Sequence, residues 1–250
     1  MLSFDIETTG LSALDGHHIT IICTEDFHSR ARKAYEFARF RDDPEKWQAL
    51  REDVLRDFEN APSLAAFNGH RFDLPFMAVA LDIPVSTVIR WKHKMVDIFE
   101  SCKTKYNHTF SLNLLCEKNK IPVKISSGLA AIKMAAHGEF DSLREYCEYD
   151  VEIINQLHAR RFVLNPRNDE IMDLADLAPE YVYPEAASQT PTEKMAMAVE
   201  AWTALKTRST AECVADPRAD FLPAENHGDV PDETSPVKRQ RLDLPDMLEG

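Results

Sequence analysis

The feature that most constrains this chain is a pair of acidic residues inside its first apolar segment, Phe4-Asp5-Ile6-Glu7-Thr8-Thr9-Gly10. Residues 1–6 predict a short buried strand. Because strand side chains alternate between two faces, Asp5 and Glu7 are expected on the same face. Two carboxylates buried together repel each other unless they lie at an edge or share a cation, and hard oxygen ligands favour Mg²⁺ or Mn²⁺ over zinc. The alternative is an exposed strand end that carries two solvated acids.

Composition limits the class of protein. The chain has 250 residues, 44% of them hydrophobic, which is enough for one sizeable core and an appendage. It contains no apolar run long enough for a membrane helix, and acidic residues interrupt the N-terminal segment, so it does not resemble a signal peptide. We therefore expect a soluble intracellular protein that makes no membrane contact. The cysteines are odd in number and lack a C-x-x-C pair, which favours reduced thiols over disulfides or a zinc site; they are Cys23, Cys102, Cys116, Cys147 and Cys213.

The net charge of −13 is concentrated near the C-terminus, with −11 on residues 169–250 and −2 on residues 1–168. Between residues 90 and 133 the balance is reversed, with nine basic residues against three acidic ones. Such a stretch predicts a surface that contacts backbone phosphates, and the alternative is a solvated face with ordinary lysines. The basic residues are Arg90, Lys92, Lys94, Lys103, Lys105, Lys118, Lys120, Lys124 and Lys133.

Hydrophobic periodicity predicts an alternation of strands and helices after the first strand. Asp43 and Pro44 form a typical helix start, as N-cap and first helical residue. The predicted elements are strands at 18–24 and 32–40, a helix at 44–60, a strand at 63–67, a helix that opens within 70–77 and ends near 81, a loop at 86–94, a strand at 95–99, a helix at 112–120 and, from 128 onward, two or three helices of which the last is long.

Two further segments carry acidic residues in a suggestive context. Asp73 follows the turn-forming pair Asn68-Gly69 and stands near the start of a predicted helix. Tyr146 and Asp150 are four residues apart, so they lie on one face of the last long helix. Taken singly, these features also suit a helix-capping acid, a plain turn and a surface Tyr–Asp pair.

Together, Phe4–Gly10, Asn68-x-x-x-Phe72-Asp73 and Tyr146-x-x-x-Asp150 resemble, in order and approximate spacing, the three exonuclease motifs of the DEDD superfamily. The chain is similar to the tyrosine branch, because the histidine branch would need His where Glu145 stands. It looks closest to the proofreading exonuclease domain of family B DNA polymerases and their stand-alone relatives, over roughly residues 1–165. The resemblance implies an α/β, ribonuclease H-like fold: a mixed sheet, its first three strands antiparallel, flanked by helices. The order of the predicted elements agrees with that fold.

The resemblance also implies roles for individual residues. The carboxylates of Asp5, Glu7, Asp73 and Asp150 would hold two Mg²⁺ or Mn²⁺ ions, which activate the attacking water and stabilise the leaving 3′ oxygen. Tyr146 would complete the catalytic set by orienting the water, because a tyrosine hydroxyl with a pKa of about 10 is a poor base at neutral pH.

Substrate contacts follow from the same resemblance. The backbone of Thr8, Thr9 and Gly10 would face the 3′-terminal nucleotide, which glycine lets approach closely. Leu11 and Phe72 would stack on terminal bases, and Asn68 would support the site or contact the penultimate nucleotide. For Leu11, a plain place in the core is the alternative.

The function expected from these features is a metal-dependent 3′-to-5′ exonuclease that releases nucleoside 5′-monophosphates from single-stranded DNA. One alternative is a 3′ exoribonuclease, because sequence does not show which contacts admit a 2′-hydroxyl. The other is a non-catalytic nucleic-acid-binding or scaffold module. Retention of all five motif residues argues against the module, since a buried acidic cluster without a metal is a stability liability.

The expected organisation is an exonuclease domain at 1–165, a linker and C-terminal helix at 166–208, and a disordered acidic tail at 209–250. With no room for a polymerase domain, we expect a free-standing exonuclease or a subunit of a larger assembly. Thr190 and Glu193 form a capping box for the C-terminal helix, which is expected to pack on the core; the helix or the tail as a binding site for a protein partner is the alternative. The tail's basic residues resemble a short nuclear localisation signal, so the expected location is nuclear or cytoplasmic; they are Lys238, Arg239 and Arg241.

Overall fold

The computed structural model describes residues 1–123, 128–177 and 184–207. All of them belong to the first of two units, residues 1–216. The expected disordered tail at 209–250, its basic cluster at Lys238, Arg239 and Arg241, and Lys124 lie outside the described residues.

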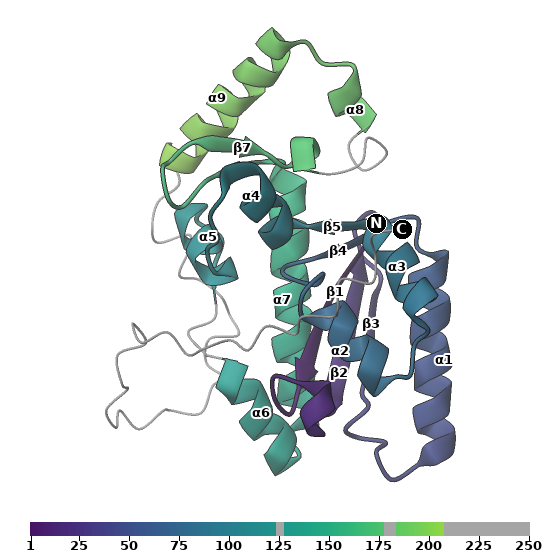
Figure 1. The fold of residues 1–250 in the computed structure, drawn as a ribbon. Helices are drawn as coiled ribbons and strands as arrows, with labels where there is room; N and C mark the ends of the chain where they lie inside the picture. The colour runs from purple at the N-terminus through teal and green to yellow at the C-terminus, as the bar shows by residue number, and fades with distance from the viewer. Residues whose placement is uncertain (124–127, 178–183, 208–250) are drawn as a thin grey trace, which may run out of the picture. The chain divides into compact units, whose positions relative to one another are not determined.

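A five-stranded sheet forms the centre of this unit (Figure 1). Its strands are β1 (Leu2–Thr8), β2 (Ile19–Asp26), β3 (Arg32–Tyr35), β4 (Leu64–Ala66) and β5 (Met95–Asp97), in the order β3-β2-β1-β4-β5. The first three pair antiparallel, whereas β4 pairs parallel with β1 and β5 parallel with β4. The predicted ribonuclease H-like α/β sheet is therefore confirmed.

Helices cover both faces of the sheet (Figure 1). One face packs against α1 (Pro44–Asn60), α2 (Asp73–Ala80) and α3 (Val85–His93), in a core cluster that includes Phe4 and Ile6. The other face packs against α6 (Gly128–His137) and α7 (Phe140–Arg160), with Ile21 and Cys23 facing them. Because Phe4 and Ile6 face α1 to α3, Asp5 and Glu7 face α7.

The start and the end of α1 both follow local rules. The Asp43 side chain accepts a hydrogen bond from the Lys46 amide (3.0 Å), and Pro44 occupies the first turn. At the other end, the Lys94 ammonium donates to the backbone carbonyls of Phe58, Glu59 and Ala61. The carbonyls at the end of a helix lack intrahelical partners, so Lys94 satisfies them.

The prediction of a loop at 86–94 is wrong, because residues 86–93 belong to α3 and Lys94 caps its end. Val88 and Trp91 are three residues apart and therefore share one face of a helix. Both are buried, and the Trp91 ring lies 5.0 Å from the Phe58 ring. Tertiary packing thus stabilises a helix too short to give a strong periodic signal.

Two predicted strands are too long. The strand at 32–40 ends at Tyr35, since Ala34 and Phe37 are three apart and cannot share a strand face. The strand at 95–99 ends at Asp97, whose carboxylate accepts the Glu100 amide (3.1 Å) and starts α4 (Ile98–Tyr106). The capping preference of aspartate therefore ends the strand and begins a helix.

The C-terminal part adds a small subdomain beside α5 (Leu112–Lys118). Strands β6 (Phe162–Leu164) and β7 (Ile171–Asp173) pair antiparallel and contact α9 (Pro191–Thr207). The predicted capping box is confirmed, because Glu193 accepts from the Thr190 amide (2.7 Å) and Thr190 accepts from the Glu193 amide (3.3 Å). The short elements η1 (Ala13–Asp15), η2 (Leu174–Leu177) and α8 (Pro184–Ala187) complete the described secondary structure.

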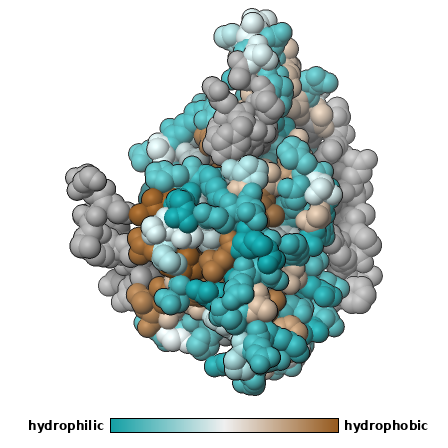
Figure 2. All heavy atoms as spheres, turned by 90° about the vertical axis from the view of Figure 1, so that its right-hand side faces the viewer, coloured by the Kyte–Doolittle hydropathy of each residue, from teal (hydrophilic) through white to brown (hydrophobic). Residues whose placement is uncertain are grey.

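Helix α9 exposes several of its larger apolar residues. Among the residues of α9 whose burial is described, Ala198 is buried, whereas Met195 and Val199 are 66% and 51% exposed. Within this part of the helix, a small residue is therefore packed and larger apolar ones face outward. Figure 2 shows the face that carries α1 and α3, which is mostly hydrophilic with hydrophobic side chains gathered on one side. In the described part of the chain, no helix has the length and apolar character that crossing a membrane requires.

Candidate metal centre

Strand β1 supplies two acids to one point of the sheet. Asp5 pairs across the strand with Cys23, and Glu7 with Ile21, so all four side chains point to the face covered by α6 and α7. The intervening Ile6 is 4% exposed and anchors the strand from the other face. The predicted shared face of Asp5 and Glu7 is therefore present, and both side chains are partly buried rather than fully solvated.

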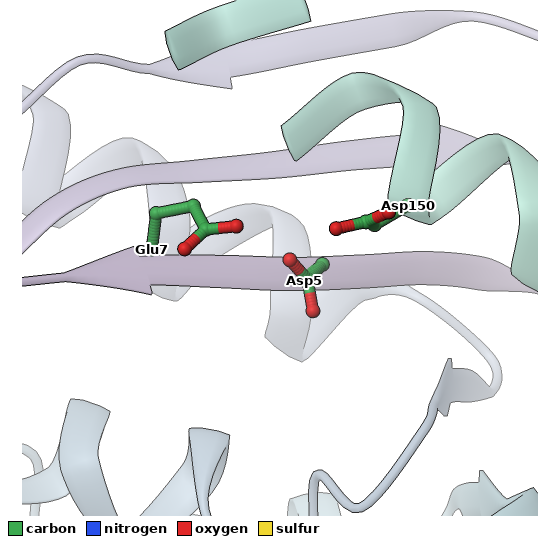
Figure 3. Close-up of side chains that lie close together, drawn as sticks. All are labelled: Asp5, Glu7 and Asp150. Carbon is green, nitrogen blue, oxygen red and sulfur yellow. The ribbon is translucent and has the colours of Figure 1, made fainter. Parts of the chain in front are cut away.

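Helix α7 supplies the third acid. Asp150 lies 143 residues after Glu7 in the sequence, yet one oxygen from each of Asp5, Glu7 and Asp150 lies within 4.8 Å of the others. Figure 3 shows the three carboxylates pointing toward a common space between β1 and α7. Oxygen ligands at this separation suit a hard divalent cation, so this cluster can hold a metal ion.

Helix α2 supplies Asp73, the fourth acid of the predicted set. It is the first residue of α2, is 3% exposed and accepts a hydrogen bond from the Ile6 backbone amide. Strand β1 pairs with β4 at Leu2 and Ser3, so Ile6 lies beyond that pairing and its amide can bond to Asp73. Asp73 lies outside the three-carboxylate cluster, but its charge acts directly on Asp5.

The pKa of Asp5 is raised well above its ordinary value, first by burial and then by the charges of Asp73, Glu7 and Asp150. The pKa of Asp73 is raised to about 7, first by burial and then by the charge of Asp97, against the opposing effect of backbone hydrogen bonds. Without a cation, Asp73 is therefore partly protonated near neutral pH, and burial together with the neighbouring charges disfavours the ionised form of Asp5. A divalent cation would remove the repulsion between them, which is the electrostatic reason that this site fits a metal.

Tyr146 lies one turn before Asp150 on α7 and is 8% exposed, in the core cluster that includes Ile21 and Cys147. The neighbouring Tyr149 belongs to a different core cluster, and its hydroxyl donates to the Pro122 carbonyl (2.8 Å). As the helical spacing predicts, the two tyrosines thus lie on different sides of α7.

The loop after β1 is held by its own hydrogen bonds. The Thr8 hydroxyl donates to the Gly10 carbonyl (2.6 Å), and the Thr9 hydroxyl accepts the His18 amide (2.9 Å). A Cβ at Gly10 would lie 2.5 Å from the His17 ring, so the ring packs directly on this glycine. Leu11 is 75% exposed, so the alternative that placed it in the core is wrong.

The second motif forms a tight turn that leads into α2. Asn68 has a φ of +68°, and a Cβ at Gly69 would lie 2.6 Å from the Ala66 Cβ, which explains why glycine occupies that position. Phe72 is half-buried, and its ring lies 5.8 Å from the Phe76 ring. This turn therefore fixes where Asp73 enters the site.

Asp97 is the site residue that the sequence reasoning missed. It is 1% exposed, and its carboxylate accepts the amides of Asn68 (2.9 Å), His70 (2.8 Å) and Glu100 (3.1 Å). It ties the second-motif turn to the end of β5 and raises the pKa of Asp73. A signal was present, since an aspartate three residues before Glu100 is a helix-start pattern.

At least four of the nine basic residues at 90–133 make contacts within the fold. Arg90 pairs with Glu59, Lys105 with Asp176 (3.1 Å) and Lys118 with Asp169, while Lys94 caps α1. That the stretch contacts phosphates stays a prediction. Within the described residues, Lys92, Lys103 and Lys133 make no side-chain ion pair, so they are the lysines most available to a phosphate.

One comparison with known proteins gives a match. A family model described as RNase_H_2, of the RNase H superfamily, matches residues 2–132, which is slightly more than half of the chain. Asp5, Glu7 and Asp73 lie inside the matched range, whereas Tyr146 and Asp150 follow it on α7. No curated protein matches the sequence.

Proposed function

Since the chain belongs to the RNase H superfamily, we propose that it is a metal-dependent 3′-to-5′ exonuclease of the tyrosine-containing DEDD branch. Its substrate would be single-stranded DNA with a free 3′ end, and its product a nucleoside 5′-monophosphate. Residues 1–165 would form the catalytic domain. The convergence of Asp5, Glu7 and Asp150 on one point of a ribonuclease H-like sheet is the observation that carries this proposal.

The four acids would together coordinate two metal ions. Asp5 belongs to the cluster with Glu7 and Asp150, and the charge of Asp73 also acts on it, so Asp5 would be shared by two ions. Glu7 and Asp150 would complete the shell of one ion, and Asp73 would hold the second directly or through water. Bound Mg²⁺ or Mn²⁺ supplies a lowered pKa for the attacking water and charge stabilisation for the leaving 3′ oxygen.

The remaining residues would position the substrate and the water. Tyr146 stands one turn from Asp150, where its hydroxyl would orient the water rather than deprotonate it. Hydrogen bonds made by the Thr8 and Thr9 hydroxyls hold the loop after β1, which would present a rigid backbone to the terminal nucleotide. Leu11 is exposed beside this loop, where it would stack on a base.

The test is a time course on single-stranded DNA and RNA oligonucleotides labelled at the 3′ or the 5′ end, with Mg²⁺, Mn²⁺ or EDTA. A ladder that shortens from the 3′ end and requires metal supports the proposal, and the polymer that is degraded faster identifies the substrate. The Asp5→Asn variant should lack this activity. Asp53→Asn is the matched control, because it removes an acid that pairs with Arg56 on the surface of α1.

Two outcomes would contradict the proposal. Equal cleavage in EDTA would exclude a metal-dependent site. Binding of either polymer without any cleavage would instead favour a non-catalytic nucleic-acid-binding module.

A further inference from the structure

A cavity of about 510 Å³ lies where β1 ends and β2 begins. Three aromatic side chains line it, Phe37 after β3, Trp47 in α1 and Phe140 at the start of α7. The Phe37 and Trp47 rings are 5.6 Å apart in an edge-to-face contact. The volume of the cavity falls within the range of small-molecule sites, roughly 300–1,000 Å³. Such sites are mostly apolar and contain a few well-positioned polar groups.

A β-bulge places one such polar group in the cavity. Glu7 pairs with Ile21 and Thr8 with Ile19, so Thr20 is the extra residue of β2 and faces no residue of β1. Bulges redirect side chains and occur frequently next to active sites. Thr20, the residue that this bulge leaves unpaired, lines the cavity.

The Thr20 hydroxyl has no hydrogen-bond partner within the described residues, although the residue is 3% exposed. A buried hydroxyl without a partner is unfavourable, and such groups are rare in folded proteins. A ligand in the cavity would supply the missing partner.

Arg41 adds a cation to the same cavity. The Arg41 side chain is exposed and makes no ion pair with the acids of the described residues. A guanidinium group is well suited to a phosphate because it can donate two parallel hydrogen bonds. The cavity therefore combines aromatic walls for a planar ring, a hydroxyl for a ring substituent and a cation for an anionic group.

The cavity is next to the acidic cluster and separate from it. None of the four motif acids lines it, whereas Thr9, two residues after Glu7, does. The Thr9 amide donates to the His18 carbonyl (2.9 Å), and the Thr9 hydroxyl accepts the His18 amide. Thr9 and His18 both line the cavity, so these bonds hold two of its wall residues together.

We propose that this cavity binds a nucleoside 5′-monophosphate, with the base against Trp47 and Phe37, a base substituent on the Thr20 hydroxyl and the phosphate on Arg41. The choice of a nucleotide rests on the proposed function, whose product belongs to this class. The site is a second nucleotide site beside the catalytic one.

The experiment is calorimetric titration of the full chain with deoxyadenosine 5′-monophosphate in EDTA. Without a cation the motif acids repel a phosphate, so binding under these conditions reports the cavity. Thr20→Val should weaken binding about threefold to tenfold, as expected for one lost hydrogen bond, and Arg41→Gln by about tenfold. Arg56→Gln, which changes an arginine on the surface of α1, should bind as the unchanged protein does.

Thermal unfolding of the free protein separates binding from a structural role. Thr20→Val keeps the shape of the side chain and removes a hydroxyl that lacks a partner, so Tm should stay the same or rise. A lower Tm would show that the hydroxyl supports the fold and would overturn its role in binding.

The outcomes also separate this proposal from the proposed function. Absence of saturable binding in EDTA, or equal binding by Thr20→Val and Arg41→Gln, would overturn the cavity proposal even if the protein cleaves DNA. Binding that both variants weaken would uphold it even if the protein cleaves neither polymer.

Discussion

The pKa of Asp73 makes a stability prediction that can be measured without a substrate. This carboxyl group is 3% exposed, and burial followed by the charge of Asp97 raises its pKa from 3.8 to about 7. The folded state therefore holds the proton more tightly than the unfolded state does. Its contribution to stability is complete below about pH 4 and is lost as the pH rises through about 7.

The magnitude follows from the displaced pKa. Moving a carboxyl pKa from 3.8 to about 7 corresponds to roughly 4 kcal/mol, which is an upper value because Asp5 titrates together with Asp73. Asp73→Asn removes this charge while keeping the shape of the side chain. In EDTA, the free energy of unfolding of Asp73→Asn relative to the unchanged protein should increase by up to roughly 4 kcal/mol between about pH 4 and about pH 8.

The assay is urea unfolding followed by circular dichroism at several pH values, with Asp53→Asn as a control for an exposed acid. Parallel stability curves for Asp73→Asn and the unchanged protein would refute the assigned cause, because burial of the ionised group would then cost nothing. At about pH 8, added Mg²⁺ should reduce the difference in the free energy of unfolding between Asp73→Asn and the unchanged protein, since a bound cation stabilises the ionised carboxylates of the unchanged protein.

Three further predictions concern activity and binding. Asp5→Ala should lower turnover by orders of magnitude while circular dichroism still reports a folded protein, and unchanged turnover would remove Asp5 from the site. Tyr146→Phe should reduce the cleavage rate less than Asp150→Ala does, because orienting water is a smaller contribution than holding a cation; the reverse order would contradict the role of Tyr146. Lys103→Glu should weaken DNA binding and flatten its dependence on salt, whereas Lys105→Glu should mainly lower Tm because Lys105 pairs with Asp176. An unchanged salt slope for Lys103→Glu would assign that lysine to an ordinary solvated surface.

The strand pattern and the helix starts were predictable from local sequence. The alternation around Asp5 and the β-branched run of β2 define strands because a period of two needs only neighbouring residues. Asp43 with Pro44, and Thr190 with Glu193, mark helix starts because a capping side chain acts within three residues. These elements required no knowledge of the rest of the chain.

Elements that depend on distant partners were not predictable in this way. Helix α3 exists because Trp91 packs against Phe58, and the sequence around residue 91 does not reveal that contact. Charge alone predicts a phosphate surface at 90–133, and it does not reveal that Lys94 and Lys105 contact groups 33 or more residues away. Asp97 carries a local helix-start signal, but its link to the site is not visible in the sequence, since two of its three partners come from the turn at Asn68 and His70.

By itself, the sequence determined which acids are available and which of them share a face, because the periods of strand and helix follow from backbone geometry. The resemblance to the DEDD exonuclease motifs implied the ribonuclease H-like sheet, and the order of the predicted elements agreed with it. Only the tertiary structure decided that Asp150 meets Asp5 and Glu7, and that Asp73 is buried with a raised pKa and acts on Asp5 through its charge. Distances between residues far apart in sequence, and the burial that shifts a pKa, depend on how the elements pack, and that packing is a property of the whole fold.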